Sequence, residues 1–378
     1  MIEIYNKNQK RFQTAYEKIE QAYRHKAVKE LPVIIMDANF AVCGQPEGEI
    51  PYDYFTNINT MFNYQIKKIE KHLEQIEDDY IPLLFPWYGT GVVPSALGCE
   101  IIFQQGMDPA VGSKIINRPE DVKKLRMPDP YKDGLMPQVL KTIDYMHENS
   151  DLPVSFTDCQ GPLNIAISLC GVETLFIWMY DFPELVHEIM DFSTEVLIQW
   201  IKVQKKHAGQ KLDSGAFPHA MVLPEGFGGV WIADDDCTVL SPRLYEEFVV
   251  PYNSRVFKAF NGGTLHFCGN AEHQLENFLK IEGLTGINNF CMGNFKQIVR
   301  MQEMFEDKLA IMVCDFNPLD IEEYYSRIIP QLKFKGTLLG SFITPELALY
   351  NSKYEYVSRK EDEIVRQIKE VIYRLNKR

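Results

Sequence analysis

The sequence predicts an α/β fold, specifically a (β/α)8 TIM barrel. Eight short apolar runs recur along the 378 residues, and they end in polar, aromatic or sulfur-containing side chains. Segments with the hydrophobic period of a helix lie between these runs. Continuous apolar strands that alternate with helices are typical of a parallel sheet covered on both faces, and eight such units are the number that closes a barrel.

The expected strands and helices alternate along the whole chain. Helices are expected at 58–79, 183–209, 241–260 and 320–332. Pro183 and Pro242 stand where proline favours the first helical turn, and Gly209 follows an expected helix end. The expected strands are 32–37, 81–87, 153–159, 229–236, 263–268, 286–291, 309–315 and 336–342.

One domain is expected over residues 1–378. The chain has no internal repeat, no low-complexity tract and no linker rich in Gly, Ser or Pro. Residues 1–30 are expected to form an N-terminal helical extension of the barrel. Residues 89–150 are expected to be an insertion after the second strand.

The charge balance argues against polyanionic partners. The chain carries 39 Lys and Arg against 52 Asp and Glu, a formal net charge of −13, and its basic residues form no cluster. Nucleic acids and anionic membranes need a basic face, so neither is an expected partner. No apolar stretch approaches the ~18 residues that span a bilayer, and we expect a cytoplasmic protein whose scattered cysteines are thiols.

Chemistry in a (β/α)8 barrel gathers at the C-terminal ends of the strands. Any one residue there can instead serve packing or helix capping. In this chain the strand-end positions hold mainly carboxylates and thiols, namely Asp37, Trp87, Asp158, Cys159, Asp234 to Cys237, His266, Cys268, Cys291, Cys314 and Asp315.

His266 and Cys268 form the sharpest local feature. Alternation along a strand places both side chains on one face, where an imidazole and a thiolate could converge on one ion. Nitrogen and sulfur ligands together favour zinc. The spacing alone also fits a packed histidine beside a lone thiol. Gly269 and Asn270 favour the metal site, because glycine allows a sharp turn and asparagine can bond to a ligand.

Asp234, Asp235 and Asp236 form a run of carboxylates at the end of the fourth expected strand. Because like charges repel, at least one should face a cation, a helix N-terminus or a substrate donor. Strand alternation would place Asp234 and Asp236 on one face and Asp235 on the other. Asp235 and Asp236 are the preferred catalytic candidates, and a loop and capping cluster is the alternative.

Three further residues are candidates for substrate binding. Trp87 and Tyr88 lie in a segment of aromatics and glycines, 85–91, that suits a lid or an apolar wall for a flat ligand. The same segment could simply close the barrel. Asp158 precedes a Gly-Pro break that opens the next helix, and its carboxylate could contact the substrate.

Several of these segments together resemble the uroporphyrinogen decarboxylase superfamily. They are Ser155–Pro162 (SFTDCQGP), Ile232–Pro242 (IADDDCTVLSP) with 245–248 after it, His266–Asn270 (HFCGN) and, more loosely, Arg118–Pro128. The order and spacing are most similar to the branch of zinc-dependent, corrinoid-linked methyltransferases. The resemblance covers roughly residues 150–375 and implies a TIM barrel.

The resemblance also implies cofactors, a partner and a ligand set. In that branch the His-x-Cys pair and a later Cys bind zinc, which lowers a thiol's pKa so that the thiolate can attack a methyl group on cobalt. His266 and Cys268 match this pattern, but Ser341 stands near the expected late Cys. Cys291 is the preferred third ligand, because neighbouring strands lie only ~5 Å apart, and Cys314 is the other candidate. A small corrinoid-binding protein is the implied partner, and the corrinoid is the methyl carrier.

These residues allow three functions. Methyl transfer between a corrinoid and a small thiol or other acceptor explains His266 and Cys268. Decarboxylation of uroporphyrinogen calls for arginines that grip carboxylates, yet residues 32–44 (PVIIMDANFAVCG) lack the decarboxylases' Met-Arg-Gln-Ala-Gly-Arg signature. A non-catalytic, metal-binding barrel is the third, because of Ser341. We expect the methyltransferase.

Overall fold

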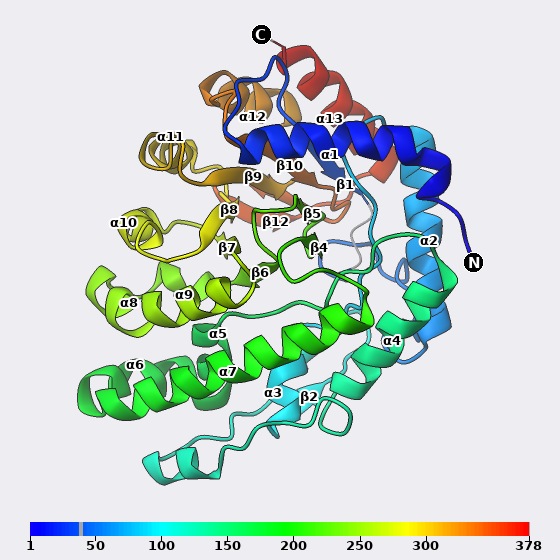
Figure 1. Cartoon of the computed structure of the whole chain (residues 1–378). Helices are drawn as coiled ribbons and strands as arrows, with labels where there is room; N and C mark the ends of the chain where they lie inside the picture. The colour runs from blue at the N-terminus through cyan, green and yellow to red at the C-terminus, as the bar shows by residue number, and fades with distance from the viewer. Residues whose placement is uncertain (38–40, 378) are drawn as a thin grey trace.

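The computed structural model describes residues 1–37 and 41–377, so residues 38–40 of the segment 32–44 lie outside the described residues. Six parallel strands form the central sheet in the order β1-β10-β9-β8-β7-β6, and helices surround them (Figure 1). The strands are fully or almost fully buried, as continuous apolar runs require. Their bounds are β1 Val33–Met36, β6 Val230–Ala233, β7 Gly263–Cys268, β8 Leu284–Phe290, β9 Ala310–Phe316 and β10 Thr337–Phe342.

The other two predicted strands close the ring without forming regular strands. The segment 81–87 meets 153–159 through a parallel bridge between Leu84 and Val154, and Gln160 forms a parallel bridge to Ala233 of β6. At the opposite edge the amide of Asp79 donates to Val33 O of β1 at 2.8 Å. All eight predicted runs therefore take part in the ring, and the (β/α)8 barrel is confirmed.

Helices form in all four predicted segments, and one of these segments is broken. The segment 241–260 divides at Val249, where Pro251 removes a helical N–H donor. Beyond these elements, short 3-10 turns lie at 6–8, 119–124, 235–238, 272–274 and 329–331. The helices are α1 Gln9–Tyr23, α2 Ile58–Gln75, α3 Val92–Ala96, α4 Met136–Asn149, α5 Pro162–Cys170, α6 Val172–Asp181, α7 Pro183–His207, α8 Pro242–Phe248, α9 Val250–Ala259, α10 Leu275–Phe278, α11 Phe295–Met304, α12 Ile321–Ile328 and α13 Glu361–Leu375.

Three two-stranded hairpins are added to the barrel. They pair β2 Ile101–Ile102 with β3 Ala110–Val111, β4 Gly215–Phe217 with β5 Met221–Leu223, and β11 Leu347–Tyr350 with β12 Lys353–Tyr356. The β4–β5 hairpin lies near the middle of the ring in Figure 1. Its tip, 218–220, reaches into the barrel, because the ring of His219 lies 4.8 Å from that of Trp231 on β6.

The segments predicted as additions occupy different places. α1 crosses the N-terminal end of the barrel, where the Tyr23 hydroxyl lies 3.1 Å from Thr264 Oγ1 at the start of β7. Within 89–150, α4 packs between α2 and α7. α4 therefore serves as the outer helix between the second and third runs, and the predicted insertion at 89–150 includes this helix.

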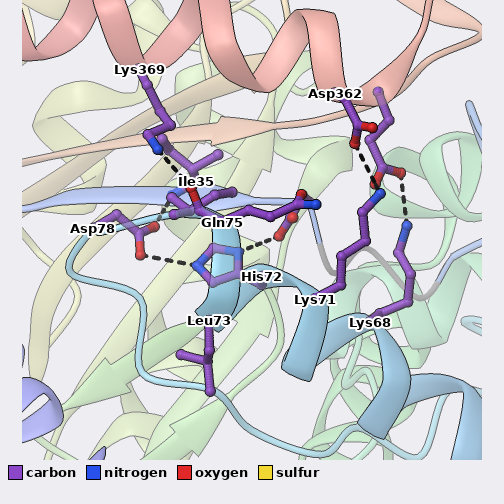
Figure 2. Close-up of polar contacts among 12 residues, drawn as sticks. Ile35, Lys68, Lys71, His72, Leu73, Gln75, Asp78, Asp362 and Lys369 are labelled. Carbon is purple, nitrogen blue, oxygen red and sulfur yellow. Dashed lines mark hydrogen bonds and ion pairs between the residues drawn. The ribbon is translucent and has the colours of Figure 1, made fainter.

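The end of α2 is fixed to β1 and α13 by charged contacts (Figure 2). The buried His72 ring has Asp37 on Nδ1 and Asp78 on Nε2, the latter at 3.0 Å, while Asp78 accepts the Ile35 amide of β1. Lys71 pairs with Glu361 and Asp362 at the start of α13. These contacts hold α2 against β1, which Asp37 directly follows.

No single helix among the described residues is long and apolar enough to span a membrane. α5 and α6 pass a test of length and composition only as a pair, and their axes bend by 103°.

Candidate metal centre and adjoining cavity

His266 and Cys268 come together at the end of β7, as strand alternation predicts. Cys268 Sγ lies 3.4 Å from His266 Nε2. Asp235, in the turn after β6, places Oδ1 3.7 Å from the same nitrogen. One ligand atom from each of the three residues lies within 4.8 Å of the other two. The structure thus brings one nitrogen, one sulfur and one oxygen atom together at the C-terminal mouth of the barrel. We call His266, Cys268 and Asp235 the metal-ligand group.

Hydrogen bonds orient this group. Nδ1 of His266 donates to Asn288 Oδ1 of β8 at 2.8 Å, which leaves the lone pair of the neutral ring on Nε2. Asp235 Oδ1 accepts the backbone N–H of Cys268 at 2.7 Å. Burial lowers the pKa of His266 to about 4, so the ring is neutral at pH 7. Burial, and then the charge of Asp235, raise the pKa of the Cys268 thiol well above its ordinary value.

The donor set fits a zinc ion. Two tetrahedral zinc ligands, at about 2.3 Å for sulfur and about 2.0 Å for nitrogen, are themselves roughly 3.5 Å apart. The sulfur–nitrogen separation of 3.4 Å matches that spacing, and the oxygen–nitrogen separation of 3.7 Å is slightly longer. A cation would also stabilise the thiolate and carboxylate whose charged forms burial now opposes. His266, Cys268 and Asp235 are therefore the residues that would hold a metal.

The structure does not bring Cys291, the predicted third ligand, into this group. Cys291 directly follows β8, but its thiol donates to Asp315 Oδ2 at 3.0 Å. Asp315 also accepts from the hydroxyls of Tyr324 and Tyr354. The alternative, Cys314, is buried and receives the side-chain amide of Asn288 at 3.4 Å. Strand adjacency therefore did not place either thiol beside His266, and Asp235 takes the third position.

The side chains of Asp234, Asp235 and Asp236 do not follow the strand alternation predicted for them. β6 ends at Ala233 and residues 235–238 form a 3-10 turn, so the two-residue period of a strand does not apply. Asp234 is buried and accepts from the hydroxyl of Tyr245 and the amide of Asn253, which anchors α8 and α9. Asp235 faces His266, and Asp236 is half-buried in the turn outside the metal-ligand group.

Residue 341, near which the resemblance places the late Cys, faces away from the metal-ligand group. Ser341 is buried near the end of β10, and the next residue, Phe342, faces the barrel interior. Alternation along β10 turns Ser341 away from that interior. A ligand at residue 341 would point away from His266.

A cavity of about 120 Å³ lies inside the barrel near the metal-ligand group. His266, Cys268 and Asp235 do not line it, but the rings of two lining residues, His219 and Phe290, lie 4.5 and 5.2 Å from the ring of His266. Asp158 and Trp87, both predicted substrate contacts, line the cavity. Tyr88 does not, because its hydroxyl lies 2.8 Å from Thr142 Oγ1 in a buried contact with α4. Burial raises the pKa of Asp158 to about 7. The lining residues are Met36, Ala41, Cys43, Tyr80, Leu83, Phe85, Trp87, Asp158, Pro218, His219, Ala220, Phe290, Phe316 and Phe342.

Sequence reasoning missed His219 and Asn288. His219 lines the cavity, its ring centroid lies 4.5 Å from that of His266, and its Nδ1 shares Asn288 Oδ1 at 3.0 Å. Asn288 and Asn289 interrupt an otherwise apolar predicted strand. Because buried amides are normally hydrogen-bonded, this interruption could have indicated their hydrogen-bonding role from the sequence alone. The hairpin that carries His219 has no such signal, because only the fold brings its tip into the barrel.

Comparison with known proteins identifies the family. The family model described as uroporphyrinogen decarboxylase (URO-D) matches residues 14–213 and 219–313. The chain belongs to the URO-D family. This result confirms the resemblance found in the sequence.

Curated relatives of this URO-D protein include two kinds of enzyme. A methylated-thiol–coenzyme M methyltransferase of Methanosarcina mazei is 25% identical over 203 residues, 53% of this chain and 50% of the relative. A uroporphyrinogen decarboxylase of Hydrogenovibrio crunogenus is 27% identical over 169 residues, 43% of this chain and 42% of the relative. The chain thus spans about half the length of the curated relatives it matches.

A solved structure covers nearly the whole chain. A methyltransferase from Methanosarcina mazei superimposes with a TM-score of 0.67 at 16% sequence identity, over 95% of this chain and 98% of that one. At this identity the likeness establishes the fold, which agrees with the TIM barrel.

Proposed function

We propose that this URO-D protein is a zinc-dependent methyltransferase. It would move a methyl group between a corrinoid, carried by a small partner protein, and a thiol or other small acceptor. The observation that carries the proposal is the convergence of His266, Cys268 and Asp235 beside a small cavity at the barrel mouth. The similarity to a methylated-thiol–coenzyme M methyltransferase supports it.

Each residue of the group has a definite task. His266 offers Nε2 because Asn288 holds its Nδ1 proton. Asp235 Oδ1 accepts the Cys268 N–H and also lies 3.7 Å from His266 Nε2, so this oxygen would be a ligand through its second lone pair. A zinc ion held there would act as a Lewis acid that keeps a thiol deprotonated at neutral pH. Trp87 and Asp158 line the cavity in which the small substrate would lie.

The cavity favours methyl transfer over uroporphyrinogen decarboxylation. Uroporphyrinogen decarboxylation is the alternative, because some of the curated relatives are uroporphyrinogen decarboxylases. A substrate with eight carboxylates calls for arginines, but no Lys or Arg of the described residues lines this cavity. A volume of about 120 Å³ is also below the roughly 300 Å³ of the smallest pockets for drug-sized ligands. A metal-binding barrel without catalysis is the remaining alternative.

The direct experiment loads the purified chain with zinc under reducing conditions and mixes it with methylcobalamin and a small thiol. Loss of the cobalt–carbon absorption and formation of the methyl thioether are expected. Cys268→Ser should abolish both, while Cys170→Ser, a buried change on α5 far from the group, should not. Carbon dioxide release from uroporphyrinogen with no methyl transfer would support the decarboxylase instead.

A further inference from the structure

The cavity beside the metal-ligand group has aromatic walls on opposite sides of the barrel. Phe85 and Trp87 come from the second run, with ring centroids 5.3 Å apart. Phe290, Phe316 and Phe342 come from the ends of β8, β9 and β10, with centroid distances from 4.9 to 6.0 Å. In the order of the ring, β8 stands across from the second run. A ligand in the cavity would therefore meet aromatic rings on two sides.

Among the described residues that line the cavity, Asp158 has the one carboxyl group. Its Oδ1 accepts from the Gln160 side-chain amide at 2.9 Å. Burial raises the pKa of Asp158 to about 7, and a bound cation would favour its ionised form. No Lys or Arg within the described ranges 1–37 and 41–377 pairs with Asp158 or lines the cavity. The nearest imidazole, His219, has its Nδ1 bonded to Asn288 Oδ1 at 3.0 Å. An anionic ligand would find no counter-charge here.

Aromatic faces together with a carboxylate form the environment that recognises methylated cations. The faces attract a cation through their quadrupoles, and their apolar surface suits its methyl groups. A hydrated ammonium such as Lys loses more on entering such a cavity than an onium ion whose charge is spread over methyl groups. The small volume limits the ligand to a few heavy atoms.

We propose that this cavity binds a small methylated onium cation, a quaternary ammonium or a sulfonium, between the two aromatic walls with Asp158 as its counter-ion. As a statement about the methyl-carrying substrate, this rests on the proposed methyltransferase function. As a statement about binding, it requires neither metal nor corrinoid. An experiment can therefore contradict cation binding without contradicting the methyltransferase function, and the reverse.

Calorimetry with the metal-free chain tests the proposal. Tetramethylammonium and trimethylsulfonium are the cationic probes, tert-butanol is the neutral molecule of similar shape, and methanesulfonate is the anion. Both cations should bind at least tenfold more tightly than tert-butanol, and methanesulfonate should not bind. Equal affinity for tert-butanol, preference for methanesulfonate, or no cation binding would overturn the proposal.

Substitutions then locate the bound cation. Phe290→Leu and Phe342→Leu keep apolar volume and remove a ring, and each should weaken cation binding roughly 2- to 30-fold, the range of one cation–π contact. Asp158→Asn should weaken cation binding by about tenfold or more and leave tert-butanol unchanged. Phe295→Leu, on α11 outside the cavity, is the matched control. Thermal unfolding shows that each variant is folded, and unchanged affinity in all three cavity variants would contradict this assignment.

The metal measurement separates this inference from the proposed function. Cation binding in a chain that takes up no zinc would support the cavity assignment and contradict the methyltransferase. Zinc binding and methyl transfer without cation binding would overturn the cavity assignment alone.

Discussion

Asn288 Oδ1 accepts a hydrogen bond from Nδ1 of His266 at 2.8 Å. The two residues are direct partners across strands β8 and β7. Because this bond fixes the ring proton on Nδ1, Nε2 faces Cys268 and Asp235 with its lone pair free. The buried amide thus orients His266 for the metal binding that we propose.

Loss of the Asn288 amide should weaken metal binding. Asn288→Leu removes the acceptor for His266, and we expect zinc affinity to fall roughly 10- to 100-fold, as is typical for outer partners of metal ligands. Asn289→Leu, the neighbouring position whose amide bonds to Phe267 O and Gln297, is the matched control. Competition with a chromophoric chelator measures both. Equal zinc affinities of the two variants would show that Asn288 does not orient a ligand.

Asp235 and Asp236 should differ in their effect on the metal. Asp235→Asn removes a charged ligand oxygen 3.7 Å from His266 Nε2, and zinc affinity should fall at least as far as for Asn288→Leu. Asp236→Asn lies outside the metal-ligand group and should bind zinc like the wild type. Competition with the same chromophoric chelator measures the zinc affinity of both variants. A loss confined to Asp236→Asn would reverse the assignment.

Cys291→Ser should retain the metal. A serine hydroxyl can still donate to Asp315, so the variant should fold and carry as much zinc as the wild type. Elemental analysis after gel filtration measures this content. Loss of zinc from the folded variant would restore Cys291 as the third ligand.

The barrel could be predicted from the sequence, because apolar runs and helical periods are local features. Six of the eight runs form regular strands, whereas 81–87 and 153–159 join the ring only through single bridges. The His266 and Cys268 pair could also be predicted, since two residues of one strand have a fixed geometry. Its surroundings could not. Asp235 lies in a 3-10 turn where alternation fails, and His219 arrives from a hairpin tip 47 residues earlier in the chain.

His72 should make the fold sensitive to alkaline pH. Asp78 and Asp37 raise its pKa from 6.5 to about 9 against the opposing effect of burial. Because the folded pKa exceeds the unfolded one, this stabilisation is complete below pH 6.5 and is lost as the pH rises from there through 9. It amounts to about 3 kcal/mol.

Urea unfolding between pH 6 and 10 measures the contribution of His72. The free energy of unfolding of the wild type should fall across that range, and His72→Gln should start lower and change less. His147→Gln, an exposed histidine on α4, should behave like the wild type. Parallel pH profiles for the wild type and His72→Gln would contradict the account.

The most direct test of the central claim is the zinc content of the chain purified under reducing conditions. We expect one zinc per chain in the wild type, and loss of it in folded His266→Ala and Cys268→Ser variants. A folded wild type that binds no zinc when zinc is supplied, or variants that keep it, would contradict a metal centre at His266 and Cys268.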